Sequence, residues 1–214
     1  YKAESIEAIP TRKMGFYEKY VKRAIDVVCA SAAIICFSPL YIGVAILVKF
    51  KLGSPVLFTQ DRPGLIGEDG KETIFKMYKF RTMYVQDTKE EKKGWTTKND
   101  PRVTKVGRIL RKTSIDELPQ LFNILIGDMS LVGPRPERPQ YVEKFKEEIP
   151  RYMIKHQVRP GLTGWAQING YRGDTSIRKR IEYDIYYIEN WSMSFDFKIM
   201  FLTIFRGFIN ENAY

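Results

Sequence analysis

The sequence is poor in the two side chains that most often build metal and redox sites. Cys29 and Cys36 are its only cysteines, and His156 is its only histidine. This scarcity argues against a disulfide framework and against zinc sites of the usual cysteine and histidine kind. It also leaves little room for histidine-based triads or relays, so any acid, base or nucleophile is expected to be a carboxylate. The two cysteines lie in an apolar stretch, where we expect core or lipid-facing thiols in a reducing cell.

Acidic residues are outnumbered by basic ones. The 214 residues contain 35 lysines and arginines against 25 aspartates and glutamates, a formal net charge of +10. Such a surplus predicts an anionic partner, which could be nucleic acid, an acidic membrane surface or a phosphorylated small molecule. The chain has no recognisable DNA- or RNA-binding motif, so no nucleic-acid partner is expected.

Charge is almost absent between Ala24 and Val48, where Asp26 is the only charged residue. As a helix this stretch would be about 37 Å long at 1.5 Å per residue, enough for the hydrocarbon core of a bilayer. Pro39 removes a backbone donor and clashes with the preceding turn, while the Ser38 hydroxyl can bond a freed carbonyl. The sequence therefore predicts a helix that kinks at Ser38 and Pro39.

The flanks of this stretch are basic on both sides, with Lys22 and Arg23 before it and Lys49 and Lys51 after it. A spanning helix usually carries its lysines and arginines on one side, so the symmetry favours a re-entrant helix with Lys22 and Arg23 at the membrane interface. A straight span and a buried helix of a soluble core are the alternatives, whereas a signal peptide lacks a cleavage site here. The chain begins at Tyr1 without methionine, and we expect it to be part of a longer protein.

The rest of the sequence predicts a small domain with mixed elements. Strands are expected at 53–60 and 73–83, a charged loop at 86–100, helices at 105–112 and from 116, a short strand after 127, and glycine-rich loops at 159–173. Two amphipathic, aromatic-rich helices are expected at 177–190 and 195–209, either in the core or at a membrane interface. The predicted fold is α+β: a linker over 1–16, a re-entrant membrane helix-kink-helix over 17–52, and a mainly helical catalytic domain over 53–214. This domain has a short β ribbon and interfacial helices at its C-terminal end.

Two adjacent carboxylates, Asp116 and Glu117, follow a cationic stretch and precede an arginine between prolines. Ser114 and Glu117 fit a helix capping box, the structural explanation of the pair. Pro119 disfavours Ser114 as the N-cap and favours Asp116, because it would then occupy the first turn. In either register Asp116 is expected at a helix N-terminus, which also favours a bound phosphate.

Arg135 lies between Pro134 and Pro136, whose rings restrict the backbone. The arginine could present its planar guanidinium to a phosphate with little loss of entropy. The same tripeptide also occurs as an extended surface segment, and alone it does not choose between the two.

Six ordered motifs together give the chain a family resemblance that extends from about residue 17 to the C-terminus. The motifs are Lys22-Arg23-Ala24-Ile25-Asp26, Ser38-Pro39, Tyr78-Lys79-Phe80-Arg81-Thr82-Met83, the segment from Leu110 to Leu121, Pro134-Arg135-Pro136, and the segment from Pro160 to Gln167. With these motifs the sequence resembles the bacterial sugar transferases, or monotopic phosphoglycosyl transferases. Its ending is most similar to long-form members that transfer glucose 1-phosphate to undecaprenyl phosphate.

The resemblance implies that Asp116 attacks the sugar-bearing phosphorus of a UDP-sugar, releases UMP and forms a phosphoglycosyl-aspartate. Undecaprenyl phosphate then accepts the sugar phosphate. Mg²⁺ is the implied cofactor, with Asp116 as a ligand, and Glu117 assists proton transfer or orients the second substrate. Arg111 is expected to bind phosphate, Pro134-Arg135-Pro136 the nucleotide, and Arg172 the diphosphate. Lys79 and Arg81 are further candidates for this cationic pocket, and Asp184 is either a site residue or a helix-surface carboxylate.

The expected partners are a UDP-sugar, undecaprenyl phosphate and membrane lipid, at the cytoplasmic face of the bacterial inner membrane. Such a reaction would be the first membrane step of exopolysaccharide, capsule or other glycoconjugate synthesis. A non-catalytic basic membrane scaffold and a Mg²⁺-dependent phosphodiesterase are the alternatives. The sequence does not identify the sugar, and it leaves a homo-oligomer open.

Overall fold

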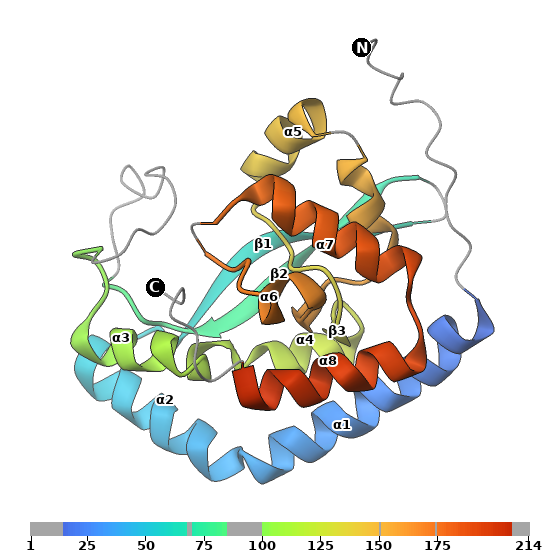
Figure 1. Ribbon diagram of the computed structural model, residues 1–214. Helices are drawn as coiled ribbons and strands as arrows, with labels where there is room; N and C mark the ends of the chain where they lie inside the picture. Colours follow the sequence, from blue (N-terminus) through green and yellow to red (C-terminus); the bar gives the residue numbers. More distant parts are fainter. Residues whose placement is uncertain (1–14, 68–69, 85–99, 150, 174, 207–214) are drawn as a thin grey trace.

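The computed structural model describes residues 15–67, 70–84, 100–149, 151–173 and 175–206 (Figure 1). A π-helical turn (Tyr17–Val21) precedes α1, and 3-10 turns occupy Ile115–Glu117 and Tyr152–Gln157. The helices are α1 (Lys22–Cys36), α2 (Ser38–Leu52), α3 (Lys105–Lys112), α4 (Gln120–Ile126), α5 (Pro139–Glu148), α6 (Trp165–Ile168), α7 (Ile177–Glu189) and α8 (Met193–Arg206). The strands are β1 (Leu57–Ile66), β2 (Glu72–Phe80), β3 (Ser130–Val132) and β4 (Gly161–Thr163). This mixture of helices with a short β ribbon confirms the predicted α+β class.

The kink predicted from the sequence is present. Helices α1 and α2 meet at Phe37 with a bend of 63° and form the V-shaped base of the molecule (Figure 1). The Ser38 hydroxyl donates a hydrogen bond of 2.8 Å to the Ile35 carbonyl, and Pro39 lies in the first turn of α2, where its missing N–H costs nothing. Within the described ranges, neither helix alone is long and apolar enough to cross a bilayer, although the two arms together are.

Both arms of the base, α1 and α2, pack against the rest of the protein. Ala30 of α1 packs against Leu121 and Ile124 of α4, and Val44 and Val48 of α2 pack with Phe80 and Leu110 in a second cluster. Helices α3, α4 and α8 lie directly above the base, and α5 and α7 lie on the opposite side of the molecule (Figure 1). One face of the helix pair is thus part of the hydrophobic core.

Strands β1 and β2 form an antiparallel ribbon in which Phe58 pairs with Lys79 and Gln60 with Met77. The ribbon was predicted, but its first strand begins later, at Leu57, and runs further, because its pairing with β2 continues to Ile66. Short parallel pairing between β3 and β4 was not predicted. It depends on glycine: a Cβ on Gly161 would lie 2.1 Å from the backbone nitrogen of Gly133.

Some predictions fall outside the described residues. The expected linker lies there except for its last two residues, as do most of the charged loop at 86–100 and the end of the last predicted helix, which the structure describes as α8 up to Arg206. The division into segments 1–16, 17–52 and 53–214 stays a prediction.

Candidate active site

Glu117 lies at the centre of a cluster of cations contributed by three separate segments. Its Oε1 is 2.8 Å from Nζ of Lys79 and 2.6 Å from Nη2 of Arg135, and its Oε2 is 3.0 Å from Nη2 of Arg172. The residue is 4% exposed. Burial would raise the pKa of Glu117, but Arg135, Arg172 and Lys79 together hold this pKa well below its usual range. The carboxylate therefore stays ionised and fixes the three cations in place.

Asp116 has the opposite environment although it is the next residue. It is also buried, at 6% exposed, and its Oδ1 is enclosed without a hydrogen-bond partner. Burial and the adjacent Glu117 raise the pKa of Asp116, against the opposing effect of Lys79, Arg172 and Arg111. A buried carboxylate oxygen with no donor to stabilise it, next to several cations, has the environment expected of a nucleophile in an anion-binding site.

The backbone before Asp116 differs from the predicted capping box. Ser114 adopts a left-handed conformation with φ of 56° and makes no capping hydrogen bond, and a 3-10 turn carries Asp116 and Glu117 before Pro119 leads into α4. The capping-box interpretation is therefore wrong. The Ser114 hydroxyl instead accepts a hydrogen bond of 3.0 Å from Nη1 of Arg172, and the turn directs both carboxylates into the interior.

Hydrogen bonds fix the backbone on both sides of Arg135, the arginine between two prolines. The Pro134 carbonyl accepts a hydrogen bond of 2.9 Å from the amide of Gly161, and the Pro136 carbonyl accepts one of 3.1 Å from Nη1 of Arg62. With both neighbours fixed, the guanidinium of Arg135 extends to Glu117. The segment is thus partly buried and part of the site, and is not the free surface segment that was the alternative.

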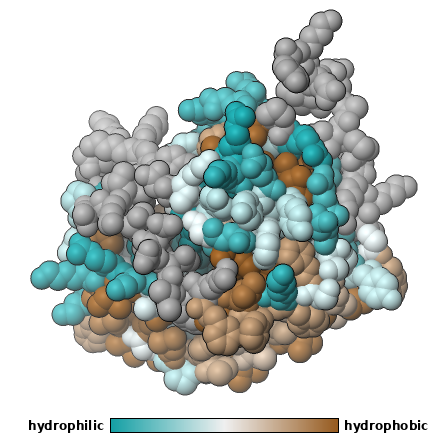
Figure 2. Space-filling view, viewed as in Figure 1, coloured by the Kyte–Doolittle hydropathy of each residue, from teal (hydrophilic) through white to brown (hydrophobic). Residues whose placement is uncertain are grey.

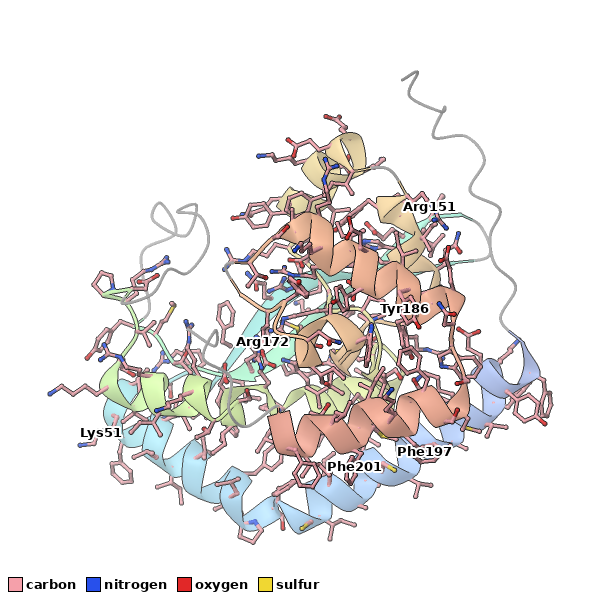
Figure 3. All side chains as sticks on the ribbon, in the orientation of Figure 1. Lys51, Arg151, Arg172, Tyr186, Phe197 and Phe201 are labelled. Carbon is pink, nitrogen blue, oxygen red and sulfur yellow. The ribbon has the colours of Figure 1, made fainter. Side chains whose placement is uncertain are left out.

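Arg172 reaches the cluster from the glycine-rich segment after α6, and Figure 3 places it in the middle of the molecule. Gly170 and Gly173 bracket it with φ of 86° and 74°, a backbone conformation that other residues rarely adopt. The two reversals turn Tyr171 and Arg172 back towards the 3-10 turn. Arg172 is therefore brought to the carboxylates as the sequence predicted.

Lys79 and Arg111 complete the cationic side of the site. Burial lowers the pKa of Lys79 to about 8, although Glu117 opposes this. Arg111, on α3, donates a hydrogen bond of 2.8 Å from Nε to the Thr82 hydroxyl and stabilises the charge of Asp116. Both residues were candidates from the sequence, and the structure brings both to the carboxylate pair.

Several other candidates do not join this cluster. The guanidinium of Arg81 donates to the carbonyls of Leu52, Gly53 and Ser54 at the end of α2, so the residue fastens the helix pair to the ribbon. Asp184 is not a helix-surface carboxylate: it is 1% exposed and lies 3.2 Å from Nζ of Lys155. Its burial is set by tertiary packing, which the pattern of α7 alone does not reveal.

The two basic residues predicted for the membrane interface bind other parts of the protein. Lys22 forms an ion pair of 2.5 Å with Asp196 of α8. Arg23 donates to the last carbonyls of α4, those of Ile124 and Leu125. Their structural role is to join α1 to the domain above it.

Arg62 was missed by the sequence analysis. Arg62 lies in β1. Burial is the main cause that lowers the pKa of Arg62 to about 9, and repulsion from Arg135 is the second. Besides the Pro136 carbonyl it donates to Gln60 Oε1 at 2.6 Å. No local motif marks it, because only the pairing of β1 and β2 and the packing of the 134–137 segment bring it to the site.

Comparison with known proteins agrees with this site. The family model described as bacterial sugar transferase matches residues 17–210. The UDP-glucose:undecaprenyl-phosphate glucose-1-phosphate transferase of Escherichia coli (strain K12) is 48% identical over 200 residues, 92% of this chain and 42% of that protein. The UDP-N-acetylgalactosamine-undecaprenyl-phosphate N-acetylgalactosaminephosphotransferase of Aeromonas hydrophila is 46% identical over 187 residues, 86% of this chain and 43% of that protein.

A shorter relative is matched over most of its length. An uncharacterized sugar transferase of Bacillus subtilis (strain 168) is 44% identical over 191 residues, which cover 89% of each chain. By contrast, the chain spans about two fifths of the first two relatives. The family match covers the bent helix pair, both carboxylates and every cation around them. The chain belongs to the bacterial sugar transferase family.

Proposed function

We propose that this protein transfers glucose 1-phosphate from UDP-glucose to undecaprenyl phosphate and releases UMP, as the first membrane step of exopolysaccharide or other glycoconjugate synthesis. The observation that carries the proposal is the unpartnered, buried Oδ1 of Asp116 beside a carboxylate, Glu117, that is paired with three cations. No donor in the protein engages this oxygen, and the surrounding cations match the charge of a diphosphate. The names of the relatives supply the substrates.

The first step of the proposed reaction is an attack by an oxygen of Asp116 on the phosphorus that bears the sugar. The bond from this phosphorus to the oxygen bridging the two phosphates breaks, and UMP leaves with the electron pair. In the second step a phosphate oxygen of undecaprenyl phosphate attacks the same phosphorus. The bond to Asp116 breaks, and the carboxylate is restored as the undecaprenyl-diphosphate sugar forms.

The remaining residues stabilise and orient the charge that moves. Lys79, Arg111, Arg135 and Arg172 would bind the phosphate oxygens. The sequence left two roles for Glu117, proton transfer or orientation of the second substrate. Its lowered pKa and its three cationic contacts favour orientation, because a carboxylate held ionised by cations is a poor proton carrier near neutral pH.

The residues present fit a Mg²⁺ ion that is shared with the substrate. Among the described residues no group of three histidine, cysteine or acidic side chains could hold a metal. Of the two site carboxylates, only Asp116 has a buried oxygen without a hydrogen-bond partner, and Mg²⁺ often takes one or two carboxylates and completes its shell with water and substrate phosphates. When bound, the ion would offset diphosphate charge. Asp116 would hold it, while the oxygens of Glu117 are occupied by cations.

The apolar surface supports the proposed place at the cytoplasmic face of the bacterial inner membrane. Exposed apolar side chains gather on α1, α2 and α8, among them Val28, Ile42, Phe50, Phe197 and Phe201. Figure 2 shows apolar residues over the base and hydrophilic residues over much of the opposite side. A surface of this kind, next to a bent apolar helix pair, suits a protein that enters one leaflet and returns. Lipid would then reach the site from below, and the soluble UDP-sugar from the hydrophilic side.

The function is tested by measuring UMP release from a panel of UDP-sugars with Mg²⁺ and undecaprenyl phosphate. The wild type is compared with Asp116→Asn and with Asp61→Asn, a matched control that removes an exposed carboxylate on β1. We expect release that needs both the lipid phosphate and Asp116, is fastest with UDP-glucose, and is unchanged in Asp61→Asn. Release without lipid would indicate a phosphodiesterase, and no release with any sugar would indicate a scaffold. A preference for another sugar would overturn the assignment of glucose alone.

A further inference from the structure

Arg180 of α7 connects two segments that are far apart in the sequence. It is 2% exposed. Its Nη1 donates to Oε1 of Glu137 at 2.7 Å, and its Nη2 donates to the Gly173 carbonyl at 2.6 Å and to the Thr175 hydroxyl at 3.1 Å. One guanidinium thus binds the segment after α6 and the segment before α5 at the same time.

These two segments carry the arginines that hold Glu117. Glu137 follows Arg135 by two residues, and Gly173 directly follows Arg172. Arg135 donates to both carboxylate oxygens of Glu117, at 2.6 Å to Oε1 and 3.3 Å to Oε2, and Nη2 of Arg172 lies 3.0 Å from Oε2. We propose that Arg180 and Glu137 are positioning residues that set the separation of Arg135 and Arg172, and thereby the affinity of the site for the diphosphate of the sugar donor. This inference rests on the proposed function.

Neighbouring charged groups stabilise the buried ion pair between Arg180 and Glu137. Burial would raise the pKa of Glu137, yet Lys155 and Arg180 hold this pKa below its usual value, so the carboxylate remains ionised. Asp184, one helical turn after Arg180 on α7, lies 3.2 Å from Nζ of Lys155. A buried pair with additional charged neighbours keeps its geometry, because separating its members would leave a charge without a partner.

The remaining contacts leave little freedom to Arg135. The carbonyls of Pro134 and Pro136 are bonded to Gly161 and Arg62, and Glu137 is bonded to Arg180. The Arg172 segment is fixed at Gly173 and Thr175 by the same guanidinium. A displacement of about 1 Å in a site that binds by charge and orientation can change rates by about 100-fold. Arg180 is therefore placed to control both phosphate-binding arginines without contacting the substrate.

The test uses Arg180→Lys, which keeps the charge and loses the planar fork, and Glu137→Gln, which keeps the shape and loses the charge. Arg151→Lys is the matched control, because Arg151 pairs with Glu189 at the other end of α7, where both side chains are about half exposed. Steady-state kinetics give kcat and KM for UDP-glucose. Thermal unfolding reports stability, and hydrogen exchange reports the backbone of 133–138 and 170–173.

We expect KM for UDP-glucose to rise about tenfold or more in Arg180→Lys and Glu137→Gln, with faster exchange in both segments, and no change in Arg151→Lys. In an Arg172→Ala background, Arg180→Lys should raise KM by less than about threefold, because Arg180 acts partly through Arg172. A lower melting temperature with unchanged KM and exchange would overturn the inference, and so would full additivity with Arg172→Ala. A wild type that turns over no UDP-sugar would defeat the proposed function. Exchange in the two segments would still decide whether Arg180 braces them.

Discussion

Asp116 and Glu117 share a backbone turn and a degree of burial, yet their carboxyl groups have opposite pKa shifts. Glu117 has three cationic contacts, which more than offset the cost of burial. Asp116 has an enclosed oxygen without a donor and a negative neighbour, which add to that cost. Paired titratable groups whose environments separate their pKa values are a frequent sign of divided catalytic roles. This division agrees with the proposed function, in which Asp116 reacts and Glu117 orients the substrates.

The raised pKa of Asp116 gives a prediction about stability. Because the pKa of Asp116 in the folded protein lies above its ordinary value of 3.8, the stability of the fold falls as pH rises from about 3.8 through the folded-state pKa. At neutral pH the ionised side chain is therefore destabilising, and Asp116→Asn should raise the melting temperature by a few degrees, with a gap that narrows as pH falls. Thermal unfolding across a pH series measures this, with Asp61→Asn as control. A variant less stable than the wild type at neutral pH would contradict the burial argument.

The lowered pKa of Lys79 predicts the alkaline limb of the pH profile. Because burial brings this pKa to about 8, the ammonium loses its proton as pH rises through that value, and kcat/KM for UDP-glucose should fall there. Lys79→Arg keeps the charge, so the fall should move to higher pH. The control is Lys51→Arg, an exposed residue at the end of α2 (Figure 3). If the alkaline fall of kcat/KM occurred at the same pH in Lys79→Arg, a group other than Lys79 would be responsible for it.

At this scale the sequence predicts the residues that lie in motifs and misses those that lie between them. Asp116 and Arg135 lie in distinctive local motifs, and the family resemblance adds Arg172. Arg62 and Arg180 reach the site only after β1 pairs with β2 and α7 packs against the core, which no local pattern encodes. Arg81 failed as a pocket residue for the same reason, because its partners are the carbonyls at the end of α2.

At the scale of elements, the bent helix pair positions the carboxylates. Tyr41 of α2 donates to the Leu118 carbonyl, one residue after Glu117, and Arg23 of α1 donates to the end of α4. The segment from the 3-10 turn to the end of α4 is thus held by one side chain from each arm. If the helix pair enters a bilayer as proposed, the angle between its arms sets where the site lies relative to the lipid.

Pro39→Ala tests this angle. Without the ring, the amide of residue 39 can bond and the α1–α2 junction can become continuous, so we predict a straighter pair. Single cysteines at positions 15 and 54, in a chain without Cys29 and Cys36, report the side of the membrane by labelling with an impermeant thiol reagent. We expect both on the cytoplasmic side in the wild type and on opposite sides in Pro39→Ala. If the two cysteines were labelled on the same side of the membrane in both the wild type and Pro39→Ala, the proposed role of Pro39 would be contradicted.

Elements with a strong periodic or proline signal were predictable, and short ones were not. The helix pair, the ribbon, α3 and the two C-terminal helices follow from runs of apolar residues and from turn residues. Strand β4 is three residues long and pairs with β3 through glycines that resemble loop residues. The turn at Ser114 depends on a left-handed backbone that a serine rarely adopts, so the capping-box pattern misled.

At the scale of the whole molecule, α8 extends the apolar base. Figure 3 shows Phe197 and Phe201 on this helix, and they are 52% and 61% exposed. Burying each of these rings in lipid would contribute about 1.5–3 kcal/mol, so both matter for membrane binding. The double variant Phe197→Ser, Phe201→Ser should bind vesicles more weakly and raise KM for undecaprenyl phosphate several-fold, with KM for UDP-glucose unchanged.

Vesicle sedimentation and kinetics with each substrate measure this effect. Ile74→Ser is the control, because Ile74 is an exposed apolar residue of β2 near the turn of the ribbon. Equal vesicle binding by the double variant and the wild type would remove α8 from the membrane surface and confine the contact to α1 and α2.

In the proposed reaction, Asp116 carries the sugar phosphate between two substrates. Isotope exchange tests it most directly: labelled UMP is incubated with UDP-glucose, Mg²⁺ and the protein, without undecaprenyl phosphate. If a phosphoglycosyl-aspartate forms reversibly, label enters UDP-glucose in the wild type and in Asp61→Asn, but not in Asp116→Asn. If sugar transfer to undecaprenyl phosphate proceeds while no label is exchanged in its absence, the lipid attacks UDP-glucose directly and Asp116 is not the nucleophile.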